Sequence, residues 1–298
     1  MWWLMAVLLA DSVHSFAVPL SAKESLHVEV SGHGAPVVLV PGLFGSAFAF
    51  RDVVPMLTAS GYRTIVIEPL GVGESAKPER ANYSLTAQAD RVAAVLDTLA
   101  VKQAIVVAHS VGGSEGFRLA YSRPDLVSAL VTIEGGPAET AATPAFKRAM
   151  RFAPWIKLLG GVRLIRWKIR QMLIASSGDA RWVTDSVVVG YTAAAARDLD
   201  GTLKAFLGVA AAREPDRIQS HLSTIACPVL LMIGTAPHQG DVGLDEITLL
   251  ERTVPRFMID SVVGAGHFLY EEHPQSVLAA VHRAAAAAAA HAQGAGSP

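Results

Sequence analysis

Two residues far apart in the chain have the types and order that nucleophilic catalysis needs. Ser110 lies in Ala108-His109-Ser110-Val111-Gly112-Gly113, and His267 lies in Gly264-Ala265-Gly266-His267. A serine hydroxyl is a poor nucleophile until a base removes its proton, and an imidazole can be that base. The small residues around Ser110 suit a sharp strand-to-helix turn, and the histidine follows the serine in the chain. This pattern predicts Ser110 as nucleophile and His267 as general base.

The carboxylate that would orient His267 has two candidates. Glu134 directly ends an apolar run, at the end of a strand where open parallel sheets place their catalytic groups. The alternative acid is Asp241, in the loop after a later apolar run, where the usual position three residues beyond Gly234 holds Pro237. Glu134 is preferred, although Asp241, or neither residue, stays open.

Backbone amides would stabilise the oxyanion of an acyl-transfer reaction. The loop Pro41-Gly42-Leu43-Phe44-Gly45-Ser46 could bring the N–H of Leu43 beside the N–H of Val111, although the loop alone could equally be a glycine-rich turn. His109 precedes the nucleophile and is expected to pack beside the turn. The residues expected around the substrate pocket are Phe44, His109, Phe152, Trp155, Trp167 and Phe268.

The elements that must position these residues alternate along the chain. Short β-rich runs separated by helical patterns predict an α/β fold, with a mostly parallel sheet covered by helices on both faces. The helical pattern over 84–100 begins with Ser84 as its N-cap and has the spacing of a crossover helix. Strands are predicted at Leu26 to Val30, Val37 to Val40, Thr64 to Ile67, Ala104 to Ala108, Ala129 to Ile133, Val229 to Ile233 and Phe257 to Val262.

The domain organisation follows from one break in this alternation. Almost a hundred residues between Ile133 and Val229 show no strand pattern, and a structureless loop of that length is implausible in a compact domain. We therefore predict a core formed by 24–136 and 224–291 with an inserted helical cap at 137–223. Residues 292–298 are expected to form a flexible tail.

Taken together, these motifs resemble the α/β-hydrolase family over about Leu26 to Ala290. The loop at Pro41 to Ser46 is similar to the H-G-x-x-G-S loop of small esterases, with Pro41 where histidine is usual. The segment from Glu68 to Pro78 resembles the haloalkane dehalogenase and epoxide hydrolase branch, which uses an aspartate nucleophile where this chain has Ser110. In some dehalogenases of that branch the triad acid is a glutamate ending the strand after the nucleophile, which corresponds to Glu134.

The cap has an unusual charge distribution. Between Thr140 and Gly178 it has eight basic residues and no acidic one, interleaved with aromatic and aliphatic residues. This pattern predicts amphipathic helices with an apolar face toward the pocket. The basic face is either an ordinary solvated surface or a contact for anionic lipid, so peripheral membrane contact through the cap or through the N-terminus is one expectation.

Composition limits the remaining classes. The chain has 298 residues, a net charge of -1 and a single cysteine, Cys227, which argues against nucleic acid as a partner and excludes an internal disulfide or a multi-cysteine zinc site. No metal or organic cofactor is expected. The apolar run Met1 to Ala10, followed by Ser15-Phe16-Ala17, suggests a signal peptide or a retained apolar segment over 1–17, and export and a cytoplasmic location are equally compatible with it. The oligomeric state is not predicted.

These inferences lead to one leading function and two alternatives. The leading expectation is a carboxylesterase that cleaves hydrophobic small esters through an acyl-enzyme on Ser110. The enzymatic alternative is a carbon-carbon bond hydrolase of the same fold. Such an enzyme would need a polar group to bind the substrate carboxylate, and an arginine of the cap could supply it. The other alternative is a catalytically silent protein that binds a ligand or a membrane.

Overall fold

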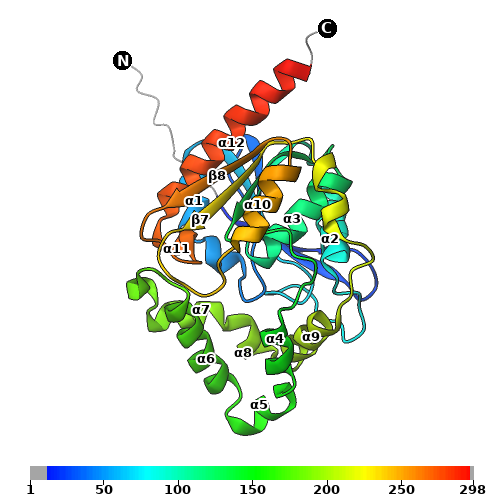
Figure 1. Cartoon of the computed structure of the whole chain (residues 1–298). Helices are drawn as coiled ribbons and strands as arrows, with labels where there is room; N and C mark the ends of the chain where they lie inside the picture. Colours follow the sequence, from blue (N-terminus) through cyan, green and yellow to red (C-terminus); the bar gives the residue numbers. More distant parts are fainter. Residues whose placement is uncertain (1–11, 296–298) are drawn as a thin grey trace, which may run out of the picture.

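The computed structural model of the protein describes residues 12–295 and contains an eight-stranded sheet (Figure 1). The strands lie in the order β1-β2-β4-β3-β5-β6-β7-β8. The first two strands are antiparallel to their neighbours, and β3 to β8 are parallel, which confirms the predicted α/β fold. The bounds are β1 His14–Pro19, β2 Ser25–Ser31, β3 Ala35–Val40, β4 Tyr62–Ile67, β5 Ala104–His109, β6 Val127–Ile133, β7 Val229–Gly234 and β8 Phe257–Val262.

Edge strand β1 is absent from the sequence prediction. It pairs antiparallel with β2, and only Val18 of its six residues is buried. A strand that buries so little apolar surface has no strong hydrophobic pattern. Ser15 to Ala17, where a signal-peptide cleavage site is expected, lie within this strand, so cleavage after Ala17 would remove most of β1. The apolar run at 1–10 lies outside the described residues.

Two helical layers cover the sheet. The strands present alternate residues to the two faces, so that Val38 and Val40 of β3 pack with one set of helices while Val37 and Leu39 pack with the other. Helices α2, α3 and α10 bury their apolar faces on the first side, and α1 and α12 do so on the second. The bounds are α1 Val53–Ala59, α2 Leu85–Thr98, α3 Val111–Ser122, α10 Leu244–Thr253, α11 Leu269–Glu272 and α12 Pro274–Ala295.

The helix α2 shows how local sequence specifies these elements. It begins after Ser84, whose side chain accepts a hydrogen bond from the N–H of Ala87, and its buried face includes Val92, Val95 and Leu96. Helix α12 ends later than predicted. It continues to Ala295, so 292–295 are helical, and only 296–298 of the predicted tail lie outside the described residues.

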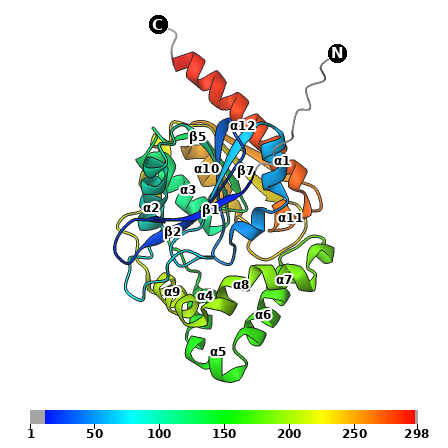
Figure 2. The same cartoon turned by 180° about the vertical axis from the view of Figure 1, so that it is seen from behind.

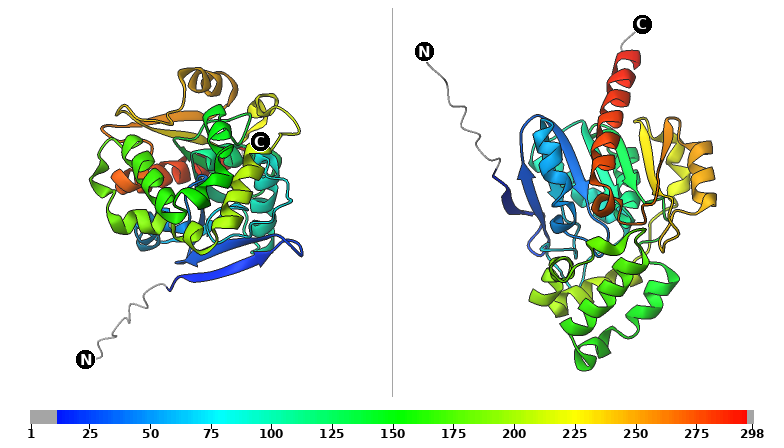
Figure 3. Two further views of the ribbon diagram at one scale, coloured as in Figure 1. Left: turned by 90° about the horizontal axis from the view of Figure 1, so that it is seen from below. Right: turned by 90° about the vertical axis from the view of Figure 1, so that its left-hand side faces the viewer.

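Between β6 and β7 the chain forms a separate group of short helices at one end of the molecule (Figures 1 and 2). This cap lies beyond the carboxyl ends of the parallel strands, whereas α12 extends from the opposite end (Figure 3). A turn at Gly160 and Gly161, both with positive φ, separates α5 from α6. The bounds are α4 Pro144–Met150, α5 Ala153–Leu159, α6 Val162–Ala175, α7 Asp185–Tyr191, α8 Ala193–Arg197 and α9 Leu199–Ala211. Within 12–295, no helix combines the length and apolar character needed to cross a membrane.

Candidate active site

Ser110 occupies a sharp turn between β5 and α3. Its backbone angles are φ 54° and ψ −123°, a region that non-glycine residues rarely adopt. The turn is closely packed, because a Cβ on Gly113 would lie 2.9 Å from the Cα of Gly135 and a Cβ on Gly135 would lie 2.6 Å from the carbonyl oxygen of Ser110. The small residues that the sequence places around Ser110 are therefore required by the packing of this turn.

His267 lies in the loop after β8, and several backbone contacts fix that loop. The N–H of His267 donates to the carbonyl oxygen of Ser176 in the cap at 2.8 Å. The Nε2 of His109 lies 3.1 Å from the carbonyl oxygen of His267, and the hydroxyl of Tyr270 lies 3.3 Å from the Nδ1 of His109. Burial holds the pKa of His109 well below its usual range, so this ring is neutral. His109 thus anchors the backbone of the His267 loop.

Glu134 ends β6 with a left-handed backbone, φ 47°, and its side chain is buried. One carboxylate oxygen accepts a hydrogen bond from the N–H of Gly234 at 2.5 Å, which ties the end of β6 to the end of β7. The other oxygen, Oε2, is buried without a hydrogen bond to any described residue. Oε2 approaches Nε2 of His238 at 3.5 Å, and Glu134 lies in one cluster with His238 and His267.

The cluster brings together one carboxylate oxygen of Glu134 and one imidazole nitrogen each of His238 and His267, all within 4.8 Å of one another. Nδ1 of His267 and Nε2 of His238 are buried without hydrogen-bond partners among the described residues. Among 12–295, these three side chains are the group whose donor atoms are close enough to hold a metal ion, and a His-His-carboxylate set suits zinc. Asp241, the alternative acid, is exposed.

Sequence reasoning missed His238. Its Nε2 lies 3.5 Å from Oε2 of Glu134, and its Nδ1 lies 2.7 Å from the carbonyl oxygen of Ala236. The only sequence signal is position, because His238 follows Pro237, which stands where the triad acid is usual. A lone loop histidine has no motif that would identify it.

The electrostatics of the cluster are dominated by burial. Burial, and after it the neighbouring His238, lower the pKa of His267 to about 4, although the Gly240 backbone and Asp241 act in the opposite direction. Burial also raises the pKa of Glu134, while the N–H of Gly234 and the imidazole of His238 act in the opposite direction. A neutral imidazole at pH 7 can accept a proton.

The loop from Pro41 to Ser46 lies directly against Ser110. A Cβ on Gly42 would lie 3.2 Å from the Cβ of Ser110, so this close approach favours glycine. The N–H of Leu43 donates to no other residue in the described part of the chain. Val111 is the first residue of α3, and its N–H therefore has no acceptor in a preceding helical turn. Two backbone donors are thus available beside the serine.

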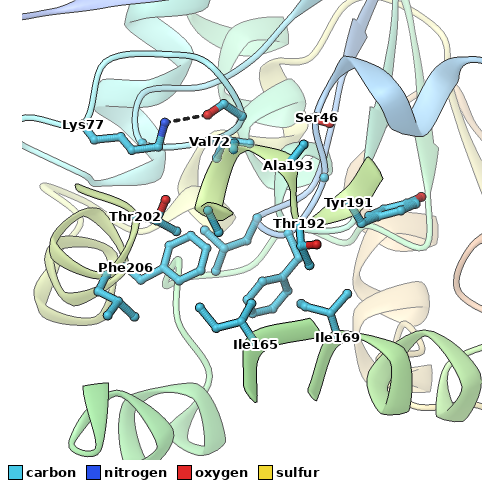
Figure 4. Close-up of a pocket in the computed structure, with 18 of the residues that line it drawn as sticks. Ser46, Val72, Lys77, Ile165, Ile169, Tyr191, Thr192, Ala193, Thr202 and Phe206 are labelled. Carbon is cyan, nitrogen blue, oxygen red and sulfur yellow. Dashed lines mark hydrogen bonds between the residues drawn. The ribbon is translucent and has the colours of Figure 1, made fainter. Parts of the chain in front are cut away.

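Next to this loop, a cavity of about 780 Å³ lies between the core and the cap (Figure 4). Ile165 and Ile169 of α6 and Phe206 of α9 point into it. Phe206 also makes edge-to-face contacts with Phe44 and Phe146, which join the loop, α4 and α9. The lining is mainly apolar, and it includes Leu43, Phe44, Ala47, Phe48, Val72, Phe146, Met150, Phe152, Ile156, Leu159, Leu164, Met172, Tyr191 and Leu203.

The residues predicted around the pocket divide into two groups. Phe44 and Phe152 line the cavity, whereas His109, Phe268, Trp155 and Trp167 do not. His109 and Phe268 are buried behind the turn. Trp155 and Trp167 are 55% and 53% exposed on the cap surface. Their prediction as pocket residues is wrong because helical periodicity identifies an apolar stripe without showing which surface that stripe meets.

Comparisons with known proteins agree with this fold. The profile of the family described as "alpha/beta hydrolase fold" matches residues 35–175. The hydrolase YugF of Bacillus subtilis is 26% identical over 241 residues, 81% of this chain and 86% of that protein. A haloalkane dehalogenase of Mycobacterium marinum is 29% identical over 185 residues, 59% of each chain. The RutD protein of Stutzerimonas stutzeri is 33% identical over 138 residues, 45% of this chain and 50% of that protein.

The chain thus spans about half the length of some of these relatives. Among solved structures, the epoxide hydrolase CorEH superposes with a TM-score of 0.77 at 20% identity, over 91% of this chain and 98% of that one. A thermophilic esterase from Thermogutta terrifontis superposes with a TM-score of 0.71 at 22% identity, over 91% and 97%. The chain has the α/β-hydrolase fold, and its residues 35–175 match the profile of that family.

Proposed function

We propose that this protein is a serine hydrolase that cleaves carboxylic esters of hydrophobic small molecules through an acyl-enzyme. The observation that carries the proposal is the strained backbone of Ser110 at the end of β5, beside a loop with a free N–H and an apolar cavity. Such strain persists only where the surrounding structure enforces it, and it is common at catalytic positions. Ala100 and Gln103 also have positive φ, but Ser110 combines it with ψ −123°, which lies outside the left-handed helical region.

In the proposed reaction, the hydroxyl oxygen of Ser110 attacks the ester carbonyl carbon as His267 takes the hydroxyl proton. The tetrahedral oxyanion accepts hydrogen bonds from the N–H groups of Leu43 and Val111. When the carbon-oxygen ester bond breaks, His267 returns the proton to the departing alkoxide and the alcohol leaves. Water then attacks the acyl-serine with His267 again as base, which releases the acid and regenerates Ser110.

Glu134 is the proposed acid that orients His267. It supplies a buried carboxylate oxygen without a hydrogen bond among the described residues, in the cluster that contains His267, whereas Asp241 is exposed. The left-handed backbone at Glu134 turns its side chain from the end of β6 toward β7. A carboxylate at this position stabilises the imidazolium that forms when His267 accepts the serine proton.

The cavity supports apolar esters as the substrate class. Its volume is within the range of about 300–1,000 Å³ that is usual for small-molecule sites, and its walls are mainly apolar. Three lysine and arginine side chains line it, and each already has a partner. Lys168 lies over the ring of Trp167. Arg197 pairs with Glu74, and Lys77 donates to the carbonyl oxygens of Gly73 and Ser75. This engagement favours an ester over the carboxylate-bearing substrate of a carbon-carbon bond hydrolase.

The test is turnover of p-nitrophenyl esters from acetate to decanoate by the full-length protein. We expect kcat/KM to rise with acyl length while the chain fits the cavity, by up to about fourfold per CH2 at ~0.8 kcal/mol each. Ser110→Ala should lower kcat by at least about 10³-fold. The matched control is Ser122→Ala, at the exposed end of α3, which should keep full activity.

Two results would contradict the proposal. Full esterase activity in Ser110→Ala would remove the proposed nucleophile. Turnover of a vinylogous diketone acid by the wild type, with no turnover of any ester, would favour the carbon-carbon bond hydrolase instead. A primary haloalkane and an epoxide complete the substrate panel, and neither should react, because an alkyl ether on serine cannot be hydrolysed as an acyl-serine can.

A further inference from the structure

The cap ends in an exposed apolar protrusion, here called the cap tip, formed by Phe152, Trp155, Leu158 and Leu159. These four side chains are 68%, 55%, 76% and 69% exposed, within eight consecutive residues. Helix α5, which holds three of them, lies at the end of the cap farthest from the sheet (Figures 1 and 2). Scattered exposed apolar residues are normal, but a contiguous group of large ones marks an interaction surface.

Basic side chains flank the cap tip. Lys147, Arg148 and Arg151 precede it and Arg163 and Lys168 follow it, and all five are exposed. None of the five forms an ion pair with a residue in the described part of the chain, although Arg170 further along α6 pairs with Asp185. With no acidic residue between 140 and 178, this surface is complementary to a negatively charged partner.

The cap tip is also part of the cavity wall. Phe152 and Leu159 line the cavity as well as being exposed, and Ile156 lies between them on α5 and lines it too. The same short helix therefore separates the cavity from the outside. A molecule that met the tip would meet the wall of the cavity at that point.

We propose that the cap tip inserts into the interface of an anionic lipid bilayer, with the flanking cations on the lipid headgroups. Aromatic and leucine side chains on one side with lysine and arginine around them match the requirements of an interfacial helix. A protrusion of one seven-residue helix suits a deformable lipid surface better than a broad protein interface of about 800 Å² per partner. Apolar esters would then enter the cavity from the lipid along α5, a step that rests on the proposed function.

The test measures vesicle binding separately from catalysis. Full-length Ser110→Ala protein, which cannot turn over lipid esters, is co-sedimented with phosphatidylcholine vesicles with or without phosphatidylglycerol, at low and high salt. The tip variant adds Trp155→Ser and Leu158→Ser, and the charge variant adds Arg148→Gln and Arg151→Gln. The matched control adds Leu244→Ser, because Leu244 is an equally large side chain that is 81% exposed outside the cap.

We expect the protein to bind phosphatidylglycerol vesicles, and this binding should weaken with salt. Binding should fall at least about tenfold in the tip variant and should also fall in the charge variant. The Leu244→Ser control should bind as well as the parent protein. Equal binding by the tip variant would overturn the proposal, since another segment would then hold the vesicles. The absence of binding to anionic vesicles at low salt would overturn it as well, and so would a tip-dependent dimer in place of vesicle binding. Hydrolysis of a soluble ester by the wild type, measured without vesicles, tests the proposed function independently.

Discussion

The sheet core and the cap use their apolar residues in opposite ways. In the core, Leu39, Val107 and Leu130 are completely buried between the sheet and its helices. In the cap, the large apolar side chains of α5 are mostly exposed, and Leu173 is the residue of α6 that is fully buried. The tightly packed part holds Ser110 and Glu134 in strained conformations, and the loosely packed part is free to meet substrate and surfaces. For the proposed function, this division would place the chemistry in the core and the selectivity in the cap.

Removal of the charge of Glu134 tests the role of the packed core. Glu134→Gln should lower kcat by roughly 10³- to 10⁴-fold, because the neutral amide cannot stabilise the imidazolium of His267 or fix its tautomer. The measurement is kcat on a soluble short-chain ester at pH 7. Asp241→Asn is the matched control and should stay within about threefold of the wild type, since Asp241 is exposed. If Asp241→Asn strongly lowered kcat while Glu134→Gln kept normal kcat, the triad acid would be Asp241 and not Glu134.

A second prediction compares packing in the two regions directly. Leu130→Ala in β6 should lower the free energy of unfolding by about 3 kcal/mol, because it leaves a cavity in a fully buried site. Leu158→Ala on the cap tip should change it by less than about 0.5 kcal/mol, because that side chain is exposed. Urea unfolding followed by circular dichroism measures both. A loss of similar size in the two variants would show that the cap tip packs against something in solution.

The same division determines how much of the protein could be predicted from sequence. Parallel strands buried on both faces appear as continuous apolar runs, so the sequence predicts seven of the eight described strands. The exception is β1, which has no such run because five of its six residues are exposed. Ser110 and His267 have motifs of their own. Trp155 and Trp167 were misplaced, because an amphipathic pattern does not reveal whether its apolar stripe faces a cavity or the outside.

The cluster of Glu134, His238 and His267 could not be predicted without the three-dimensional structure. Choosing between Glu134 and Asp241 depends on which loop end turns toward His267, and that depends on the left-handed backbone at Glu134 and its bond to Gly234. His238 could not be found from its neighbours in sequence, because its importance comes only from the 3.5 Å approach of Nε2 to Oε2 of Glu134.

His238 should modestly shift the pH dependence of the core site. His267 must be neutral to accept the serine proton, so kcat/KM should fall as pH falls through its pKa of about 4. A charged His238 disfavours protonation of His267, and His238→Gln should therefore raise that pKa and move the acid limb of the profile to higher pH. Asp241 favours protonation of His267, so Asp241→Asn should move the limb to lower pH.

The opposite signs make this pair of variants a sharp test. Each profile is measured between pH 3.5 and 8 with a soluble ester, and circular dichroism at each pH separates titration from unfolding. A merely structural role for His238 would lower the plateau and leave the position of the limb unchanged. Shifts in the same direction for both variants would mean that the charges around His267 do not control its titration, and the proposed contact between His238 and the catalytic cluster would then be wrong.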